Sequence, residues 1–212
     1  MIGCKDKDIV FIHGLWMNGY DMSLLMHRFD NAGYRTHRFH YPSRSSVAEN
    51  AARLTDYLQH FELNPPHLVC HSLGGLVARQ YLNRENAINI GSVVMLGTPN
   101  QTSRAAATLK NWPGGQWLLG NSLHHGLLGP LPEWNEAIPL GVIAGDLRLG
   151  MGMIIPGIPE PNDGTIAVEE TRLEGMQDHI VVHASHFGLL LAESAWLQSR
   201  QFIEQGCFQH SD

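Results

Sequence analysis

Cysteine, charge and long apolar runs are all scarce in this 212-residue chain. Its three cysteines, Cys4, Cys70 and Cys207, cannot all pair, and their spacing fits no zinc motif. We therefore expect reduced thiols in a cytoplasmic protein that binds no metal and no cofactor. No apolar run is long enough to cross a membrane, so we expect neither a transmembrane segment nor a secretion signal.

Positive charge is also limited. Lysine and arginine total 14 against 20 acidic residues, and no basic run stands out. The sequence therefore predicts no nucleic-acid partner. Because 43% of the residues are hydrophobic, the chain contains enough apolar side chains for one core. We expect residues 1–212 to form a single domain, whose oligomeric state the sequence does not predict.

Short apolar runs alternate with helical patterns along the chain. The first helical pattern covers Tyr20–Ala32, the second follows a capping box at Ser46–Glu49, and the last covers His186–Gln205. The alternation predicts an α/β fold of about six mostly parallel strands, covered by helices on both faces. The expected strands are Ile9–Ile12, Tyr34–His40, His67–Val69, Ser92–Leu96, Leu140–Ala144 and His179–Val182.

Residues 101–135 interrupt this alternation. The segment has no strand character and is too long for a simple connection. We interpret it as a short helical insert that forms a lid or pocket wall, with a packed helical hairpin as the alternative. Its tryptophans and leucines favour a pocket for an apolar acyl or alcohol group, to which we assign Trp112 and Trp117.

The most informative motif surrounds Ser72, between the strand His67–Val69 and the helix that follows. A serine on a sharp strand-to-helix turn exposes its hydroxyl as a nucleophile, beside the free N–H groups of a helix N-terminus. Gly74 and Gly75 let this helix approach the neighbouring strand. The usual pattern is G-x-S-x-G, and Cys70 replaces its first glycine. Cys70 is the rival nucleophile, which we disfavour because this position is expected to be buried.

A serine hydroxyl needs a base and a group that orients the base. His186 lies between the last strand and the last helix, at the same sheet edge as Ser72. The acid is Asp163 or Asp146. We favour Asp163, because its Asn-Asp-Gly turn holds a carboxylate rigidly by local backbone bonds, and Asp146 remains the alternative. His71 adjoins Ser72 and is expected to point away from it.

Backbone N–H groups are also needed to bind the oxyanion of the reaction. Leu73 at the start of its helix offers one. The other is expected from Leu15 or Trp16, in the loop after the first strand. We include Trp16 and His13 of this loop among the candidate pocket residues, although a histidine at position 13 most often bonds its own loop.

Five motifs follow one another along the chain: Ile12–Leu15, His71–Gly75, Leu96–Pro99, Asn162–Gly164 and Ser185-His186. Together and in this order they resemble the α/β-hydrolase fold, most closely its lipase and esterase branch, to which triacylglycerol lipases belong. The resemblance implies Ser72 as nucleophile, His186 as base, Asp163 as acid and the residue after His13-Gly14 as an oxyanion donor. It also implies that Asn100 borders the site. Because the chain begins at the strand that carries the oxyanion loop, the fold is expected to be a minimal version.

The function that the resemblance implies is hydrolysis of a lipid or small-molecule carboxylic ester through an acyl-enzyme. The same Ser-His-Asp triad serves acyltransferases and thioesterases, which are the alternatives. A catalytically inactive binding protein is less favoured, because the set of candidate groups is complete.

Overall fold

The computed structural model describes residues 8–61, 64–122, 126–129, 131–150 and 157–210. Within them, six strands form one sheet in the order β2-β1-β3-β4-β5-β6, and every neighbouring pair is parallel. This confirms the predicted fold class. The strands are β1 (Asp8–Ile12), β2 (Arg35–Phe39), β3 (His67–His71), β4 (Val93–Leu96), β5 (Leu140–Gly145) and β6 (Asp178–Val182).

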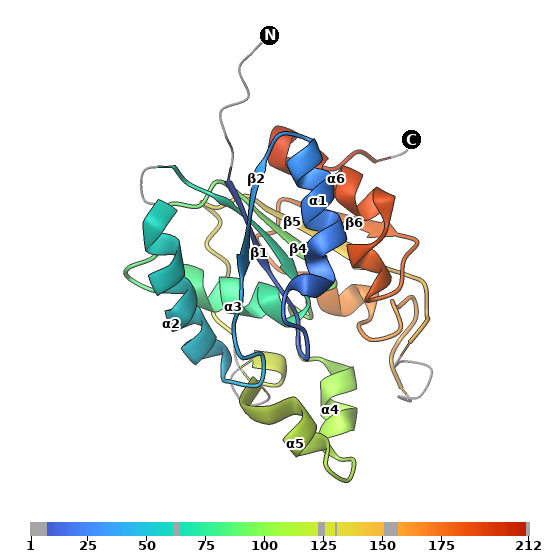
Figure 1. Ribbon diagram of the computed structural model, residues 1–212. Coiled ribbons are helices and arrows are strands. Elements are labelled where there is room, and N and C mark those ends of the chain that lie inside the picture. The colour runs from blue at the N-terminus through green and yellow to red at the C-terminus, as the bar shows by residue number, and fades with distance from the viewer. Residues whose placement is uncertain (1–7, 62–63, 123–125, 130, 151–156, 211–212) are drawn as a thin grey trace.

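Helices connect these strands and cover both faces of the sheet (Figure 1). The α-helices are α1 (Ser23–Asn31), α2 (Val47–Leu58), α3 (Leu73–Leu82), α4 (Arg104–Lys110), α5 (Gly115–Leu119) and α6 (Glu193–Gln205). Short 3-10 turns add η1 (Tyr20–Met22), η2 (Gln59–Phe61), η3 (Gly120–Ser122), η6 (Val168–Thr171) and η7 (Gly188–Leu190). No helix of the described residues combines the length and hydropathy that a membrane span requires.

Side-chain alternation along β1 divides the core into two halves. Val10 and Ile12 point to the face that α2 and α3 cover, whereas Ile9 and Phe11 point to the face of α1 and α6. All four side chains are fully buried. Because both faces of the sheet are covered, the inner strands β1, β4 and β5 consist almost entirely of apolar residues and glycine. In such folds a ligand binds at the carboxyl edge of the sheet.

Local sequence signals explain two helix starts. The predicted capping box is confirmed, since Ser46 Oγ accepts the Glu49 N–H at 3.2 Å and the Glu49 carboxylate accepts the Ser46 N–H at 3.0 Å. The prediction of one helix from His186 onward is wrong. The Gly188 N–H donates to Ser185 Oγ at the start of the separate turn η7. Helix α6 begins after this turn, at Glu193.

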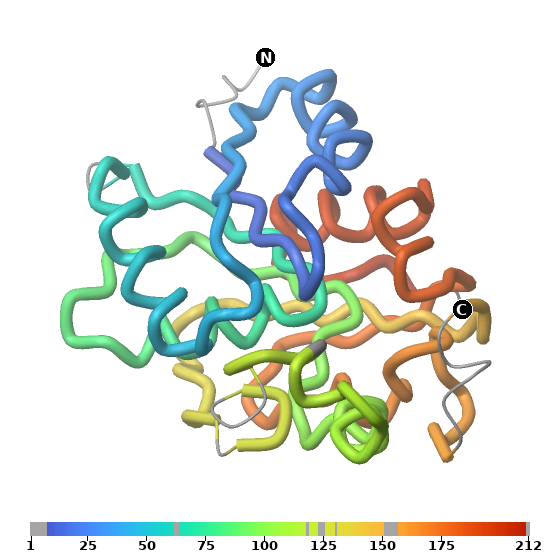
Figure 2. The backbone as a smooth tube through the Cα atoms, turned by 60° about the horizontal axis from the view of Figure 1, so that its bottom comes forward, coloured from blue at the N-terminus to red at the C-terminus, as the bar shows by residue number. Residues whose placement is uncertain are grey.

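The insert contributes α4, α5 and η3, which lie below the carboxyl ends of the strands in Figure 1. Figure 2 turns this edge forward and shows the green α4–α5 segment across it. Arg44 attaches the insert to the loop before α2. Its guanidinium donates to Trp117 O and lies 4.5 Å from the Trp117 ring centroid, and its carbonyl accepts the Asn121 N–H at 2.9 Å. That residues 101–135 move as a lid stays a prediction.

Candidate active site

Ser72 stands at the junction of β3 and α3 with a strained backbone. Its φ is 51° and its ψ is −121°, a backbone conformation that residues other than glycine rarely adopt. The turn is held by two hydrogen bonds, from Ser72 N–H to Leu96 O at 2.9 Å and from Thr98 Oγ1 to Ser72 O at 3.0 Å. The strand-to-helix turn therefore presents the hydroxyl at the carboxyl edge of the sheet, as the sequence predicts.

The two glycines after Ser72 are required by close packing. A Cβ atom on Gly74 would lie 2.2 Å from Ile12 O, and one on Gly75 would lie 2.2 Å from Thr98 Oγ1. The first contact is with backbone and leaves no room for adjustment. Helix α3 therefore lies directly against the ends of β1 and β4, which brings the loops after these strands to Ser72.

Cys70 points away from the site into the core. Its side chain is fully buried among the residues that α2 and α3 cover, and burial raises the pKa of its thiol far above the ordinary value. A thiol that is buried and protonated is not a nucleophile. The structure thus excludes Cys70 as the alternative to Ser72.

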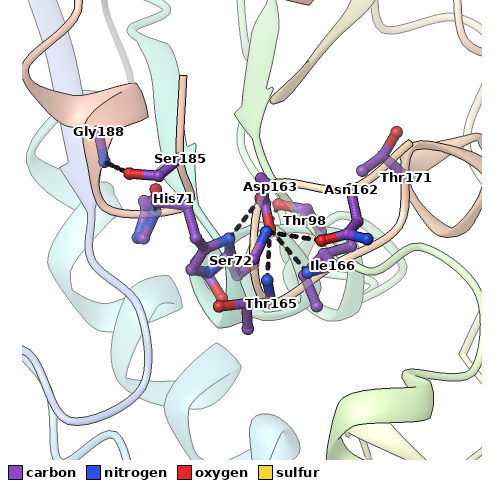
Figure 3. A network of polar contacts seen from close by, with 12 residues as sticks. His71, Ser72, Thr98, Asn162, Asp163, Thr165, Ile166, Thr171, Ser185 and Gly188 are labelled. Carbon is purple, nitrogen blue, oxygen red and sulfur yellow. Dashed lines mark hydrogen bonds and ion pairs between the residues drawn. The ribbon is translucent and has the colours of Figure 1, made fainter. Parts of the chain in front are cut away.

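Asp163 and His186 form a hydrogen-bonded pair beside the elbow. Asp163 Oδ2 lies 2.7 Å from His186 Nδ1, and the His186 N–H donates to Asp163 O at 2.8 Å. Asp163 is 1% exposed, and its second carboxylate oxygen accepts N–H groups from Thr165 and Ile166 at 2.9 and 2.7 Å (Figure 3). These bonds fix the position of the carboxylate. Because the carboxylate accepts a hydrogen bond from His186 Nδ1, that nitrogen carries the proton, and His186 Nε2 is left as an acceptor.

Asp146 lies outside this pair. It ends β5, but its carboxylate contacts His183 Nδ1 at 2.9 Å, and both side chains are exposed. Between the two candidate acids, the structure brings only Asp163 to His186. The tight Asn-Asp-Gly turn holds Asp163 in this position, because Asn162 Oδ1 accepts the Gly164 N–H at 3.0 Å and closes the turn around Asp163.

Hydrogen bonding distinguishes the two candidate oxyanion donors in the loop after β1, Leu15 and Trp16. Trp16 has a φ of 60°, and its N–H donates to Ser43 Oγ at 3.0 Å. The N–H of Leu15 takes part in none of the hydrogen bonds of the described residues, and Leu15 and Leu73 both line the pocket at Ser72. Leu73 is the first residue of α3, where N–H groups have no partner within the helix. This arrangement favours Leu15 over Trp16 as the second donor.

A pocket with a volume of about 160 Å³ opens at Ser72 and His186. Among the described residues no hydrogen bond joins Ser72 Oγ to His186, although both side chains face this space. Hydrogen bonds of this kind often tighten only when substrate binds. The pocket is mostly apolar and is lined by Leu15, Trp16, Met17, His71, Ser72, Leu73, Ser103, Ala105, Ala106, Leu109, Leu119, Leu127, Thr165, Ile166, His186 and Phe187.

Four of the five predicted pocket residues are elsewhere, and only Trp16 lines the pocket. His13 is fully buried, stacked on Tyr41 at 4.2 Å, and its Nδ1 bonds Gly14 O at 2.9 Å. Asn100 is also buried and donates to Thr171 O, facing another cleft. Trp112 and Trp117 are exposed on the outside of the insert, because its smaller side chains, not its tryptophans, face the sheet.

The prediction that His71 points away from Ser72 is wrong. Its ring is 2% exposed, lines the pocket and lies 4.8 Å from the His186 ring. Its Nε2–H donates to His186 O at 3.0 Å, whereas Nδ1 has no hydrogen-bond partner. Burial lowers the pKa of His71 to about 3, so the ring is neutral and holds the His186 loop as a donor.

The sequence predicts an apolar wall from the leucines of the insert, and Leu109, Leu119 and Leu127 do line the pocket, but it did not single out Ile166 or Phe187. Ile166 and Phe187 follow Asp163 and His186 closely, so adjacency to the candidate acid and base was the available signal. Ala105 and Leu109 are four residues apart and share one face of α4. The sequence shows this spacing, but nothing in it indicates that this face, and not the tryptophans, lines the pocket. The described residues contain no cluster of His, Cys, Asp and Glu arranged to hold a metal ion.

Comparison with solved structures identifies similar folds. A Bacillus licheniformis lipase, BlEst2 in its mature form, superposes with a TM-score of 0.73 at 20% identity, covering 96% of this chain and 93% of the lipase. A metagenomic carboxyl esterase, MGS0156, gives 0.68 at 17% identity over 87% of this chain and 66% of its own. A thioesterase domain, NocB from the nocardicin cluster, gives 0.57 at 17% identity over 90% and 89%. At these identities the likeness shows the fold alone.

Comparison of sequences gives the family. No curated protein matches this chain. The sequence model described as alpha/beta hydrolase family, however, matches residues 9–202, from the first strand to the last helix. Together with the parallel sheet, the elbow at Ser72 and the lipase and esterase folds that superpose on it, this match shows that the chain belongs to the alpha/beta hydrolase family.

Proposed function

We propose that this protein is a serine hydrolase that cleaves carboxylic esters through an acyl-enzyme. The observation that carries the proposal is the bond between Asp163 and His186 Nδ1, at 2.7 Å. It leaves His186 Nε2 free to accept a proton in the pocket that Ser72 lines. A nucleophile, a base and a group that orients the base are the three parts that such chemistry requires.

In the acylation step, His186 Nε2 takes the proton of the Ser72 hydroxyl as Oγ attacks the acyl carbon. The N–H groups of Leu73 and Leu15 stabilise the oxyanion of the tetrahedral intermediate. When the intermediate collapses, the bond to the alcohol oxygen breaks and His186 returns the proton to that oxygen. Asp163 keeps the imidazolium in place throughout, without taking its proton.

In the deacylation step, His186 removes a proton from water, and the hydroxide attacks the carbonyl of the acyl-enzyme. Ser72 leaves with the proton from His186 and the free acid is released. The lining of the pocket supports an uncharged ester. No Asp, Glu, Lys or Arg is among its described residues, and a charged acyl group buried there would be unpaired.

Steady-state hydrolysis of p-nitrophenyl butyrate tests this function. Ser72→Ala and His186→Ala are expected to lower kcat by at least about 10⁴-fold, and Asp163→Asn by about 10⁴-fold. Asp146→Asn and the exposed-surface variant Ser194→Ala serve as matched controls and are expected to remain within about twofold. Turnover by Ser72→Ala at the wild-type rate would contradict the proposal.

The same assay separates the related activities. We add thioesters of the same acids, and primary alcohols as competing acceptors for the acyl group. Faster turnover of the thioesters would assign a thioesterase, and formation of new esters in excess of free acid would assign an acyltransferase. We expect free acid as the main product, released from oxygen esters.

A further inference from the structure

We propose that the pocket selects short acyl chains, of about four to six carbons, and that helix α4 sets this length. The inference rests on the proposed function and names the acyl class that the same site accepts. It follows from the distribution of polar groups in the pocket, from the position of the base and from the volume of the pocket.

Apart from Ser103, the polar side chains of the described pocket lining all lie outside the insert, where they alternate with apolar residues such as Leu15 and Ile166. Ser72, His71 and His186 lie where the sheet ends. Among the described residues of the insert that line the pocket, Ser103 is the one with a polar side chain, and its Oγ already accepts the Ala106 N–H at 3.2 Å as the cap of α4. The remaining insert wall is hydrocarbon, from Ala105, Ala106, Leu109, Leu119 and Leu127. A wall without available polar groups favours an alkyl chain.

The position of His186 orients the substrate. The base must reach the leaving oxygen to protonate it, so the alcohol lies on the His186 side of Ser72. Phe187 lines the pocket on that side and is 49% exposed, which places it at the opening. The acyl chain then extends in the other direction, from Ser72 toward α4, which lies across the carboxyl edge of the sheet (Figure 2).

The size of the pocket limits the chain. An apolar protein cavity of about 150 Å³ binds benzene, so a pocket of about 160 Å³ accommodates about six carbon atoms. The α4 wall does not give way readily, because Ala105 and Ala106 are 3% exposed and Leu109 is 6% exposed within the packed core. A fatty acyl chain of ten or more carbons therefore exceeds the pocket.

The first experiment measures kcat/KM for p-nitrophenyl esters from acetate to dodecanoate, below their critical micelle concentrations. We expect a maximum between butanoate and hexanoate, and a fall of at least about tenfold from hexanoate to decanoate. A maximum at decanoate or beyond would overturn the inference while leaving ester hydrolysis itself established. If the wild type hydrolyses no ester, the proposed function fails, and the inference fails with it.

Variants of α4 test which residues set the length. Leu109→Ala enlarges the pocket and is expected to move the maximum two or more carbons upward. Ala106→Leu fills it and is expected to move the maximum downward. Ala107→Leu is the matched control, because this neighbour on α4 does not line the pocket, and its maximum is expected to stay with the wild type. Since the two pocket variants change the volume in opposite directions, unchanged maxima in both would contradict the assignment.

Phe187→Ala tests the orientation. With the acyl group held at butanoate and the alcohol varied from ethyl to octyl, this variant is expected to change the order of rates among alcohols. Its acyl-chain maximum is expected to remain that of the wild type. A shift of the acyl maximum in Phe187→Ala, with none in Leu109→Ala, would reverse the two ends of the substrate and overturn the proposed orientation.

Discussion

Backbone strain is concentrated in two residues of the site. Among the described residues, Trp16 and Ser72 alone combine a side chain with a positive φ, at 60° and 51°. Both line the same pocket. Such conformations cost about 1–3 kcal/mol each and persist where the surrounding structure holds them. Here the elbow is held by Leu96 and Thr98, and the Trp16 loop by Ser43.

Replacing Ser72 by glycine separates strain from chemistry. Because glycine tolerates a positive φ, Ser72→Gly is expected to unfold at higher urea concentration than Ser72→Ala, by about 1 kcal/mol in the free energy of unfolding. Both variants lack the hydroxyl and are expected to be inactive toward esters. Equal stability of the two variants in urea titrations would show that the elbow carries no strain.

Two histidines with lowered pKa values, the buried His71 and the partly buried His179, make the fold sensitive to acid. Burial lowers the pKa of His71 from 6.5 to about 3 and that of His179 to about 4. Well above pH 6.5 both rings are neutral in the folded and unfolded states. As the pH falls from 6.5 toward 3, the unfolded chain binds protons that the folded chain does not, so the free energy of unfolding decreases.

The variant His71→Gln removes one of these groups. Each histidine contributes about 1.4 kcal/mol per pH unit within its window, so the loss of stability from pH 7 to pH 5 is expected to be about 2 kcal/mol smaller in His71→Gln. Urea unfolding at the two pH values measures it, with the exposed His27→Gln as control. An identical pH dependence in wild type and His71→Gln would contradict the assignment of a neutral buried ring.

At the level of single residues, sequence identified the groups that depend on local pattern. Ser72, Asp163 and His186 each belong to a short motif, and the structure brings all three to one pocket or to its border. The choice between Leu15 and Trp16 was not readable, because it depends on Ser43, which is 27 residues from Trp16. The role of His71 was missed for the same reason, since its partner is 115 residues away.

At the level of elements, helix α2 illustrates how local signals fix a boundary. Its capping box satisfies one N–H at the helix start and one at Ser46 itself. The helix packs its buried face, including Val47, Leu54 and Leu58, into the core beside α3, whose N-terminus carries the elbow. The apolar spacing and the cap were both readable in the sequence, and both are found where the pattern predicts them.

The variant Ser46→Ala tests the contribution of this cap. Loss of the side-chain acceptor is expected to lower the free energy of unfolding by about 1 kcal/mol, measured by urea titration. The kcat for ester hydrolysis is expected to be unchanged, because the cap lies outside the pocket lining. Wild-type stability in Ser46→Ala would show that the exposed cap contributes nothing. Ser46→Asp, which keeps an acceptor, is expected to restore most of the loss.

The insert was the least predictable element. Its length and composition marked it as a segment apart, but helix assignment did not reveal which side faces the sheet. The contacts of Arg44 with Trp117 and Asn121 turn the tryptophan outward. The small and aliphatic residues of α4 then form the pocket wall. Tertiary contacts of this kind are not contained in local periodicity.

At the level of the whole molecule, the order of the strands assembles the site. Parallel strands β1, β3, β4 and β5 occupy the centre of the sheet and end at one edge. The loop with Leu15, the turn at Ser72 and the turn after β4 follow β1, β3 and β4, and the loops with Asp163 and His186 flank β6. The alternation of strands and helices predicted that a ligand binds at this edge. The order in which the strands pair in the sheet could not be predicted from the sequence and is given by the structure.

The most direct test of the account is labelling by a fluorophosphonate, which reacts only with an activated serine. Intact mass spectrometry of the wild type is expected to show one adduct, and digestion is expected to place it on the peptide that contains Ser72. His186→Ala is expected to abolish labelling while remaining folded by circular dichroism. An unlabelled wild type, or an adduct that persists in Ser72→Ala, would contradict the central claim that Ser72 is a nucleophile activated by the Asp163–His186 pair.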